Sequence, residues 1–246
     1  MEDIFNNNFQ ILSWDSEFFG YKVGRILPFR LTPEELKRTL VSLKNENVTL
    51  VYWPSDPNDS GSQEAVREMD GFLADKKTTY VIDLEHIRKQ LIEEPIIGIK
   101  EYVSMETNDE LYDLAIQSGI FSRYNVDPNI GKEHFEKLYK LWILKSVNKT
   151  LAEKVFVSMD KDNIGGMVTV GMKNGRGDIG LIAVNERMRG KNVGVNLTRS
   201  AQKWAIGKGC RYAQVVTQGD NLAACKLYEK CGYHVESIVN FFHFWI

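Results

Sequence analysis

The feature that most constrains the fold lies between residues 154 and 206, where three strand-like segments run in close succession into a helix. The segments cover 154–159, 165–172 and 178–184. Turn-forming residues separate them, at 161–163 and again at 174–177. We therefore expect an antiparallel meander that ends in a strand–loop–helix unit.

Segments of strand and helix character alternate along the rest of the chain, a pattern typical of an α/β protein. We expect further strands at 9–14, 21–27, 48–53, 78–84, 99–103, 212–217 and 235–245. Helices are expected from Thr32, from about Asn108, and over 132–147, 193–206 and 221–231. The helix at Thr32 has the clearest start, because a capping residue precedes Pro33 and two acids.

The chain has 246 residues, which suits one large domain or two small ones. The stretch from His86 to Pro95 is charged and is the best candidate for a boundary. We therefore expect a smaller N-terminal α/β domain over 1–95 and a second domain over 96–246.

The charge balance and the cysteines narrow the classes of partner and compartment. Lys plus Arg number 31 against 33 Asp plus Glu, so the chain has no broad basic field for nucleic acid. The first thirty residues do not resemble a signal peptide, and no run of eighteen apolar residues suggests a membrane span. Cys210, Cys225 and Cys231 lack CxxC spacing, and the four histidines are scattered. We expect a cytoplasmic protein with reduced cysteines, no structural metal and no membrane partner.

The most informative stretch for chemistry is 182–194, where a strand enters a loop with arginine, lysine and glycine that opens directly into a helix. Unpaired N–H groups at a helix N-terminus suit an anion such as a pyrophosphate, and glycine lets a backbone approach closely. Neither GxGxxG nor GxxxxGK[ST] is present, so dinucleotide-type and P-loop sites are excluded. An ordinary strand–loop–helix connection remains the alternative.

This stretch resembles the GNAT acyl-CoA N-acetyltransferases. The segment from Arg189 to Gly194 is similar to their pyrophosphate loop, [QR]-x-x-G-x-[GA], although Asn192 stands where the middle glycine is usual. Asn tolerates positive φ better than other non-glycine residues, so we expect a working loop. Asn221 to Tyr233 is similar to the second helix on the CoA side. The resemblance implies a mixed antiparallel and parallel twisted central sheet flanked by helices, and acetyl-CoA as cosubstrate.

Three segments together resemble one subfamily, the dTDP-fucosamine acetyltransferases. They are WDSEFFG at 14–20, SRYNVDP at 122–128, and the stretch from Val216 to Tyr228. The resemblance implies transfer of acetyl to the amine of a dTDP-linked amino-dideoxy sugar, in polysaccharide biosynthesis. It also implies that the N-terminal domain lies on the acceptor side, with the substrate-binding candidates Asp15, Glu17, Arg123, Tyr124 and Asp127.

The resemblance also implies roles for residues of the second domain. Tyr228 would protonate the departing CoA thiolate, since a phenol stays protonated at neutral pH. The residues expected to bind acetyl-CoA are Ile182, Ala183, Val184, Arg189, Gly190, Lys191, Asn192, Val193, Gly194 and Asn221. Each role has a structural alternative. Tyr228 falls on an apolar helical face, Asn221 would be a simple N-cap, and the two cations would be a solvated charge run.

Several points stay open at this level. His243 is a candidate general base, with a structural or surface histidine as the alternative. A GNAT enzyme for another small amine, an antibiotic or a protein N-terminus would carry the same loop. A non-catalytic acyl-CoA-binding module and a transferase that uses charged tRNA are rivals from other classes. A homodimer is neither required nor excluded.

Overall fold

The structure is a computed structural model that describes residues 8–246. It consists of two compact units. Among the described residues, unit 1 comprises 8–77, 122–129 and 238–246, and unit 2 comprises 78–121 and 130–237. The sequence predicted one boundary, after residue 95, whereas the structure divides the chain at other positions. The reason is that the last strand pairs inside unit 1, and no local pattern announces such a long-range pairing. The first seven residues of the predicted 1–95 domain lie outside the described residues.

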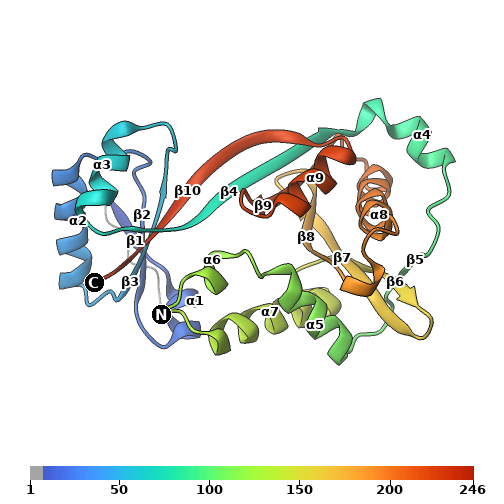
Figure 1. Ribbon diagram of the computed structural model, residues 1–246, viewed down its shortest axis with the longest axis horizontal. Coiled ribbons are helices and arrows are strands. Elements are labelled where there is room, and N and C mark those ends of the chain that lie inside the picture. The colour runs from blue at the N-terminus through green and yellow to red at the C-terminus, as the bar shows by residue number, and fades with distance from the viewer. Residues whose placement is uncertain (1–7) are drawn as a thin grey trace. The chain divides into compact units, whose positions relative to one another are not determined.

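Unit 1 is built on strands in the order β1-β2-β3-β10, where β2 is antiparallel to β1 and parallel to β3. The C-terminal strand β10 runs antiparallel to β3 and places His243 opposite Tyr52. Helices α2 and α3 lie together beside these strands (Figure 1). The elements are β1 (Phe9–Ile11), α1 (Ser13–Phe19), β2 (Val23–Ile26), α2 (Pro33–Asn45), β3 (Leu50–Ser55), α3 (Ser60–Glu68), α6 (Arg123–Val126) and parts of β4 (Phe72–Asp83) and β10 (His234–Trp245).

Helix α2 begins where the sequence predicted. Thr32 is the N-cap, and its hydroxyl accepts a hydrogen bond from the Glu35 backbone while the Glu35 carboxylate accepts one from the Thr32 backbone. This capping box satisfies two otherwise unpaired donors. The expected apolar face is buried in the core of unit 1, which also contains Trp53, Phe242 and Phe244.

The strand expected over 9–14 was wrong in its second half, because β1 ends at Ile11 and helix α1 follows. The Ser16 hydroxyl donates to the carbonyl of Leu12 at 2.6 Å and accepts from the Val23 backbone at 2.9 Å. Gly20, at φ 76°, then ends the helix in the left-handed region. These contacts with a neighbouring strand favour a turn of helix where the side-chain alternation alone suggested a strand.

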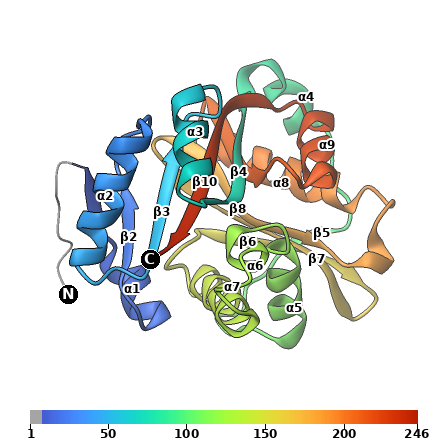
Figure 2. The ribbon, with the colours of Figure 1, turned by 60° about the vertical axis from the view of Figure 1, so that its left-hand side comes forward.

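Unit 2 contains the antiparallel meander that the sequence predicted, formed by β6, β7 and β8. The strand order is β4-β9-β8-β7-β6-β5, and β8 and β9 are parallel. Helices α8 and α9 lie on one side of these strands and α5 and α7 on the other (Figure 2). The elements not yet given are η1 (Leu84–His86), α4 (Arg88–Glu93), β5 (Ile99–Glu101), α5 (Asp109–Ser118), α7 (Lys132–Val147), β6 (Lys154–Asp160), β7 (Asn163–Lys173), β8 (Arg176–Val184), η2 (Glu186–Met188), α8 (Val193–Gly207), β9 (Tyr212–Gln218) and α9 (Leu222–Lys230).

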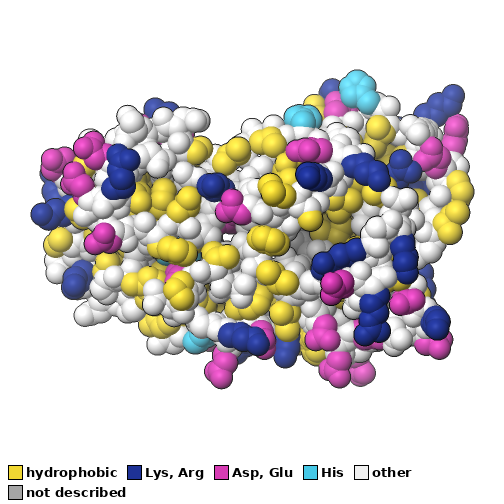
Figure 3. Space-filling view, in the orientation of Figure 1, with side chains coloured by type: hydrophobic (Ala, Val, Ile, Leu, Met, Phe, Trp, Pro, Cys, Tyr) yellow, Lys and Arg dark blue, Asp and Glu magenta, His cyan; other side chains and the backbone are white. Residues whose placement is uncertain are grey.

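The surface has no dominant sign of charge on the face shown in Figure 3, where Lys and Arg side chains alternate with Asp and Glu. That distribution agrees with the formal net charge of −2. Within residues 8–246, none of the helices combines the length and the apolar character that a membrane crossing requires.

Candidate acyl-CoA and acceptor sites

Strands β8 and β9 separate part of the way along unit 2. They pair at Gly177–Ala213, Asp178–Gln214 and Ile179–Val215, and no further pair joins them within the described residues. Strand β8 nevertheless continues to Val184 and β9 to Gln218. The separation leaves the backbone of 180–184 without a strand partner on that edge, and amide groups of a ligand can pair with such an edge. The predicted acetyl-CoA contacts at 182–184 lie in this segment.

The end of β8 is fixed by side chains. The carbonyl of Val184 accepts hydrogen bonds from Gln117 Nε2 at 2.8 Å and from Arg189 Nε at 3.3 Å. The backbone N–H of Asn185 donates to the carbonyl of Gly165 at 2.8 Å. The loop after β8 is thus tied to the strand, while Arg189 and Lys191 are exposed to solvent.

The loop then turns into α8 through two residues in the left-handed region, Gly190 at φ 76° and Asn192 at φ 58°. Asn192 therefore adopts the conformation that the usual glycine would adopt, as expected. Its side chain does not cap the helix but accepts a hydrogen bond from Lys230 Nζ at 3.2 Å. Because no side chain caps the first turn of α8, its N–H groups suit an anion.

Helix α9 packs closely against the start of α8. A Cβ atom added at Gly194 would lie 3.2 Å from the Leu227 side chain, so a glycine allows the two helices to approach. Asn221 is the N-cap of α9, and its side-chain oxygen accepts from the Ala224 backbone at 3.2 Å. Asn221 therefore caps the helix, which was the structural alternative to a role in binding acetyl-CoA. Its amide N–H₂ group can still donate to a ligand.

Tyr228 lies on α9 and is 2% exposed. Its ring centroid is 5.7 Å from that of Tyr80 and 6.1 Å from that of Tyr233. Burial is the main cause that raises the pKa of the phenol, so the hydroxyl is protonated throughout the neutral range. Tyr228 belongs to the core of unit 2, as the structural alternative predicted. A buried, protonated phenol is also a suitable proton donor, so packing does not remove the predicted role.

The predicted acceptor-side residues all lie in unit 1. The Arg123 guanidinium lies 4.5 Å from the ring centroid of Tyr52, 4.7 Å from that of Tyr124 and 4.8 Å from that of Phe241. Its Nη2 also donates to the Tyr124 hydroxyl at 2.6 Å. A guanidinium held over aromatic rings keeps its charge and a fixed plane.

Helix α1 carries the other two predicted residues. Asp15 is partly buried and acts electrostatically on Arg123, whereas Glu17 is exposed. On the same helix, Trp14 is 44% exposed and stacks on Phe18 with ring centroids 5.3 Å apart. An exposed aromatic surface beside acids is the kind of surface that binds polar ligands with an apolar face.

Asp127 is buried, and both oxygens of its carboxylate accept hydrogen bonds within unit 1. Its Oδ2 accepts from His243 Nδ1 at 2.6 Å and from Trp245 Nε1 at 3.0 Å, and its Oδ1 accepts from the Asn129 backbone at 3.0 Å. Burial raises the pKa of this carboxyl, but these hydrogen bonds outweigh burial and hold the pKa below its ordinary value. Asp127 is therefore a carboxylate that orients His243.

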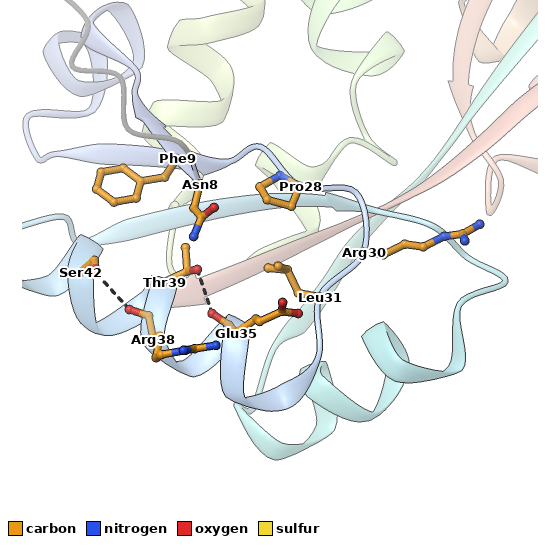
Figure 4. Close-up of a pocket in the computed structure, with 9 residues that line it drawn as sticks. All are labelled: Asn8, Phe9, Pro28, Arg30, Leu31, Glu35, Arg38, Thr39 and Ser42. Carbon is orange, nitrogen blue, oxygen red and sulfur yellow. Dashed lines mark hydrogen bonds between the residues drawn. The ribbon is translucent and has the colours of Figure 1, made fainter.

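A hollow of about 460 Å³ in unit 1 is lined by residues of α2 and of the chain before it (Figure 4). Several of its polar groups take part in local structure. Thr39 and Ser42 donate to the carbonyls of Glu35 and Arg38, at 2.8 and 3.1 Å. Arg30 is paired with Asp56 at 2.6 Å. Since these groups are engaged, the hollow is a weaker candidate site than the surroundings of Arg123.

Sequence reasoning missed Tyr21, Tyr52 and Trp245, which complete the surroundings of Arg123 and His243. Tyr21 and Trp245 lie with ring centroids 5.5 Å apart, and Tyr52 and His243 lie 4.8 Å apart. Alternation along the last strand did predict that His243 lies on the other face of the strand from Phe242 and Phe244, which belong to the core beside α2. Applied to β3, the same rule would have placed Tyr52 on the other face of the strand from Val51 and Trp53.

Comparison with known proteins agrees with this geometry. Residues 114–233 match the model of the acetyltransferase (GNAT) family. This match makes residues 114–233 similar to the GNAT family, and the chain as a whole has the α/β GNAT fold. A solved structure of a GCN5-related N-acetyltransferase from Sphaerobacter thermophilus superimposes with a TM-score of 0.62 at 16% identity, covering 96% of this chain and 76% of that one.

Two curated relatives are similar over shorter stretches. Streptothricin acetyltransferase of Escherichia coli is 32% identical over 80 residues, which cover 32% of this chain and 46% of that protein. Spore coat polysaccharide biosynthesis protein SpsD of Bacillus subtilis is 23% identical over 137 residues, or 56% of this chain and 47% of that protein. The matches thus span less than half the length of either relative.

Proposed function

We propose that this protein is an acyl-CoA-dependent N-acetyltransferase whose unit 2 binds acetyl-CoA. The separation of β8 and β9 is the observation that carries the proposal, because it gives a thioester arm an unpaired strand edge next to the start of α8. The pyrophosphate would lie on the N–H groups of that helix with Arg189 and Lys191 beside it. The pantetheine would lie along Ile182, Ala183 and Val184, with Asn221 contacting its amides.

The reaction has a neutral amine attack the thioester carbonyl and form a tetrahedral oxyanion, which collapses and expels the CoA thiolate. Tyr228 would give its proton to the sulfur, which its protonated, buried phenol permits. Backbone N–H groups on the free edge of β8 would stabilise the oxyanion. The attacking nitrogen loses one proton to solvent or to a base, and the Tyr228 phenolate takes up a proton from solvent, so that an amide and free CoA result.

We further propose that the acceptor is a nucleotide-linked amino-dideoxy sugar, such as a dTDP-4-amino-4,6-dideoxyhexose. Unit 1 supplies an arginine, two acids and exposed aromatic rings, a set that suits a ligand with phosphate, hydroxyl and ring faces. The name of SpsD, a polysaccharide biosynthesis protein, is in keeping with such an acceptor. In this proposal Asp15, Glu17, Arg123 and Tyr124 contact the acceptor, and Asp127 acts through His243.

The test is a comparison of kcat/KM for a dTDP-4-amino-4,6-dideoxyhexose and for the corresponding free amino sugar. Because binding of the nucleotide orients the amine, the nucleotide sugar should react at least about 10²-fold better. Similar values for the two acceptors would contradict the nucleotide-sugar proposal while leaving acetyl transfer intact.

Another small amine is the second candidate, favoured by the similarity to streptothricin acetyltransferase. A panel of amines, including streptothricin and a peptide N-terminus, incubated with radiolabelled acetyl-CoA distinguishes the two proposals. Binding of acetyl-CoA without transfer to any acceptor would instead favour a non-catalytic acyl-CoA-binding module.

A further inference from the structure

Unit 1 concentrates buried hydrogen-bonding atoms that lack a partner. Among the residues that the structure describes, these include Tyr21 Oη, Tyr52 Oη, Arg123 Nε and His243 Nε2. A buried hydrogen-bonding group that has lost its water and found no partner destabilises the folded protein unless something pairs with it. A cluster of them therefore indicates that a ligand or ordered water completes this part of the unit.

His243 is the most constrained member of this cluster. Its side chain is 0% exposed, and its Nδ1 faces the carboxylate of Asp127 at 2.6 Å. Since the carboxylate can only accept, Nδ1 must carry the hydrogen of a neutral ring, and Nε2 is left with a free lone pair. The neutral ring is consistent with its lowered pKa, for which burial is the largest cause. His243 Nε2 is thus a buried hydrogen-bond acceptor.

Two donors belong to the same cluster. The His243 ring lies 4.8 Å from that of Tyr52, and the Arg123 guanidinium lies 4.5 Å from the Tyr52 ring. The Tyr52 hydroxyl and the Arg123 Nε–H can both donate to a ligand oxygen. Arg123 as a whole residue is partly exposed although its Nε is buried, whereas Tyr52 and His243 are buried.

We propose that unit 1 binds the acceptor by itself, and that His243 Nε2 accepts a hydrogen bond from a hydroxyl or amine group of that acceptor. The inference rests on the proposed function and adds a specificity residue to it. A ligand that suits the site must carry a hydrogen donor for His243 and, next to it, an oxygen acceptor for Arg123 and Tyr52. A sugar ring with neighbouring hydroxyl and amine groups meets both demands, whereas a simple alkyl amine has no oxygen to offer.

Asp127 is the positioning residue in this arrangement. The substitution Asp127→Asn should change the tautomer of the His243 ring. The new amide would donate to Nδ1, so the hydrogen would move to Nε2 and the acceptor would be lost. We expect the Kd for dTDP-4-amino-4,6-dideoxygalactose to rise about 10-fold to 100-fold, as when a buried hydrogen bond is lost. Trp245→Phe is the matched control, because it removes the other side-chain donor to Asp127 and leaves the ring as it is.

The experiment combines calorimetry with nitrogen-15 NMR of histidine-labelled protein. In the free wild type, Nε2 of His243 should have the signature of an unprotonated ring nitrogen, and Asp127→Asn should invert it. Saturation with the nucleotide sugar should shift the Nε2 signal, whereas dTDP alone should not. Affinity for acetyl-CoA should be unchanged in both variants.

The outcomes separate this inference from the proposed function. If the sugar is acetylated but the Nε2 signal does not respond and Asp127→Asn keeps its affinity, the cluster holds a trapped water only and the inference fails. If the sugar binds and shifts Nε2 but is not acetylated, the site stands and the proposed function fails. If the sugar does not bind at all, both are wrong.

Discussion

The two units differ in how many of their buried polar side-chain atoms lack a hydrogen-bond partner. Both units bury polar as well as apolar side chains, but within the described residues the unpartnered buried side-chain atoms of unit 2 are confined to Trp204 and Tyr233. Unit 1 has a comparable apolar core on its α2 side but carries unpartnered atoms of arginine, histidine, tyrosine and serine elsewhere. In the proposed function, unit 2 contacts acetyl-CoA mainly through backbone groups, whereas unit 1 contacts the acceptor through side chains. The unpartnered side-chain atoms of unit 1 support its proposed role in selecting the acceptor.

The largest effect is expected for the buried hydrogen-bonded group of unit 1, which consists of Asp127, His243 and Trp245. Asp127→Ala leaves His243 and Trp245 without their acceptor, and removal of one partner from a buried network costs about 3 kcal/mol. Glu236→Ala in unit 2 breaks a partly exposed ion pair with Arg176 and should cost at most about 1 kcal/mol. Chemical denaturation measures both, and equal losses would show that the polar interior of unit 1 contributes nothing special.

The next effect concerns the proton donor of unit 2. Tyr228→Phe removes one hydroxyl and little volume, and kcat should fall about 10²-fold because general acid catalysis is lost. The affinity for acetyl-CoA should change little. Tyr233→Phe is a matched control, since Tyr233 is an equally buried phenol in the same core. An unchanged kcat for Tyr228→Phe, when chemistry limits turnover, would reduce Tyr228 to a packing residue.

Local sequence signals predicted much of unit 2 and little of the unit 1 site. The meander, the start of α8 and the left-handed Asn192 depend on neighbours in the chain, and all were predictable. The contact between His243 and Asp127 joins residues 116 apart, and Tyr52 meets His243 only because β10 pairs with β3. No periodicity encodes such pairings. Alternation gave the face of His243 but could not give its partner.

A smaller effect concerns the loop before α8. Arg189→Ala combined with Lys191→Ala removes two cations beside the proposed pyrophosphate, and the Kd for acetyl-CoA should rise about tenfold. Pantetheine, which lacks the phosphates, should bind nearly as before. Lys208→Ala, at the opposite end of α8, is the control and should alter neither affinity. Equal losses for both ligands would mean that the loop does not contact the pyrophosphate.

The smallest effect is a pH dependence of stability that arises from His243. The pKa of His243 is lowered in the folded protein, chiefly by burial. Below about pH 6.5 the ring is therefore protonated in the unfolded chain while it stays neutral in the native protein. Stability should therefore fall as the pH drops, by about 1 kcal/mol between pH 6.5 and 5.5. His243→Phe should flatten this part of the curve. A wild-type slope retained in that variant would show that other groups cause it.

The most direct test of the division between the units is a calorimetric measurement of two affinities in two variants. The ligands are acetyl-CoA and dTDP-4-amino-4,6-dideoxygalactose, and the variants are Asp127→Asn in unit 1 and the Arg189→Ala, Lys191→Ala pair in unit 2. We predict that the unit 1 variant loses affinity only for the sugar and that the unit 2 variant loses affinity only for acetyl-CoA. Loss of both affinities in either variant, or a sugar affinity that responds only to the unit 2 change, would contradict the assignment of one ligand to each unit.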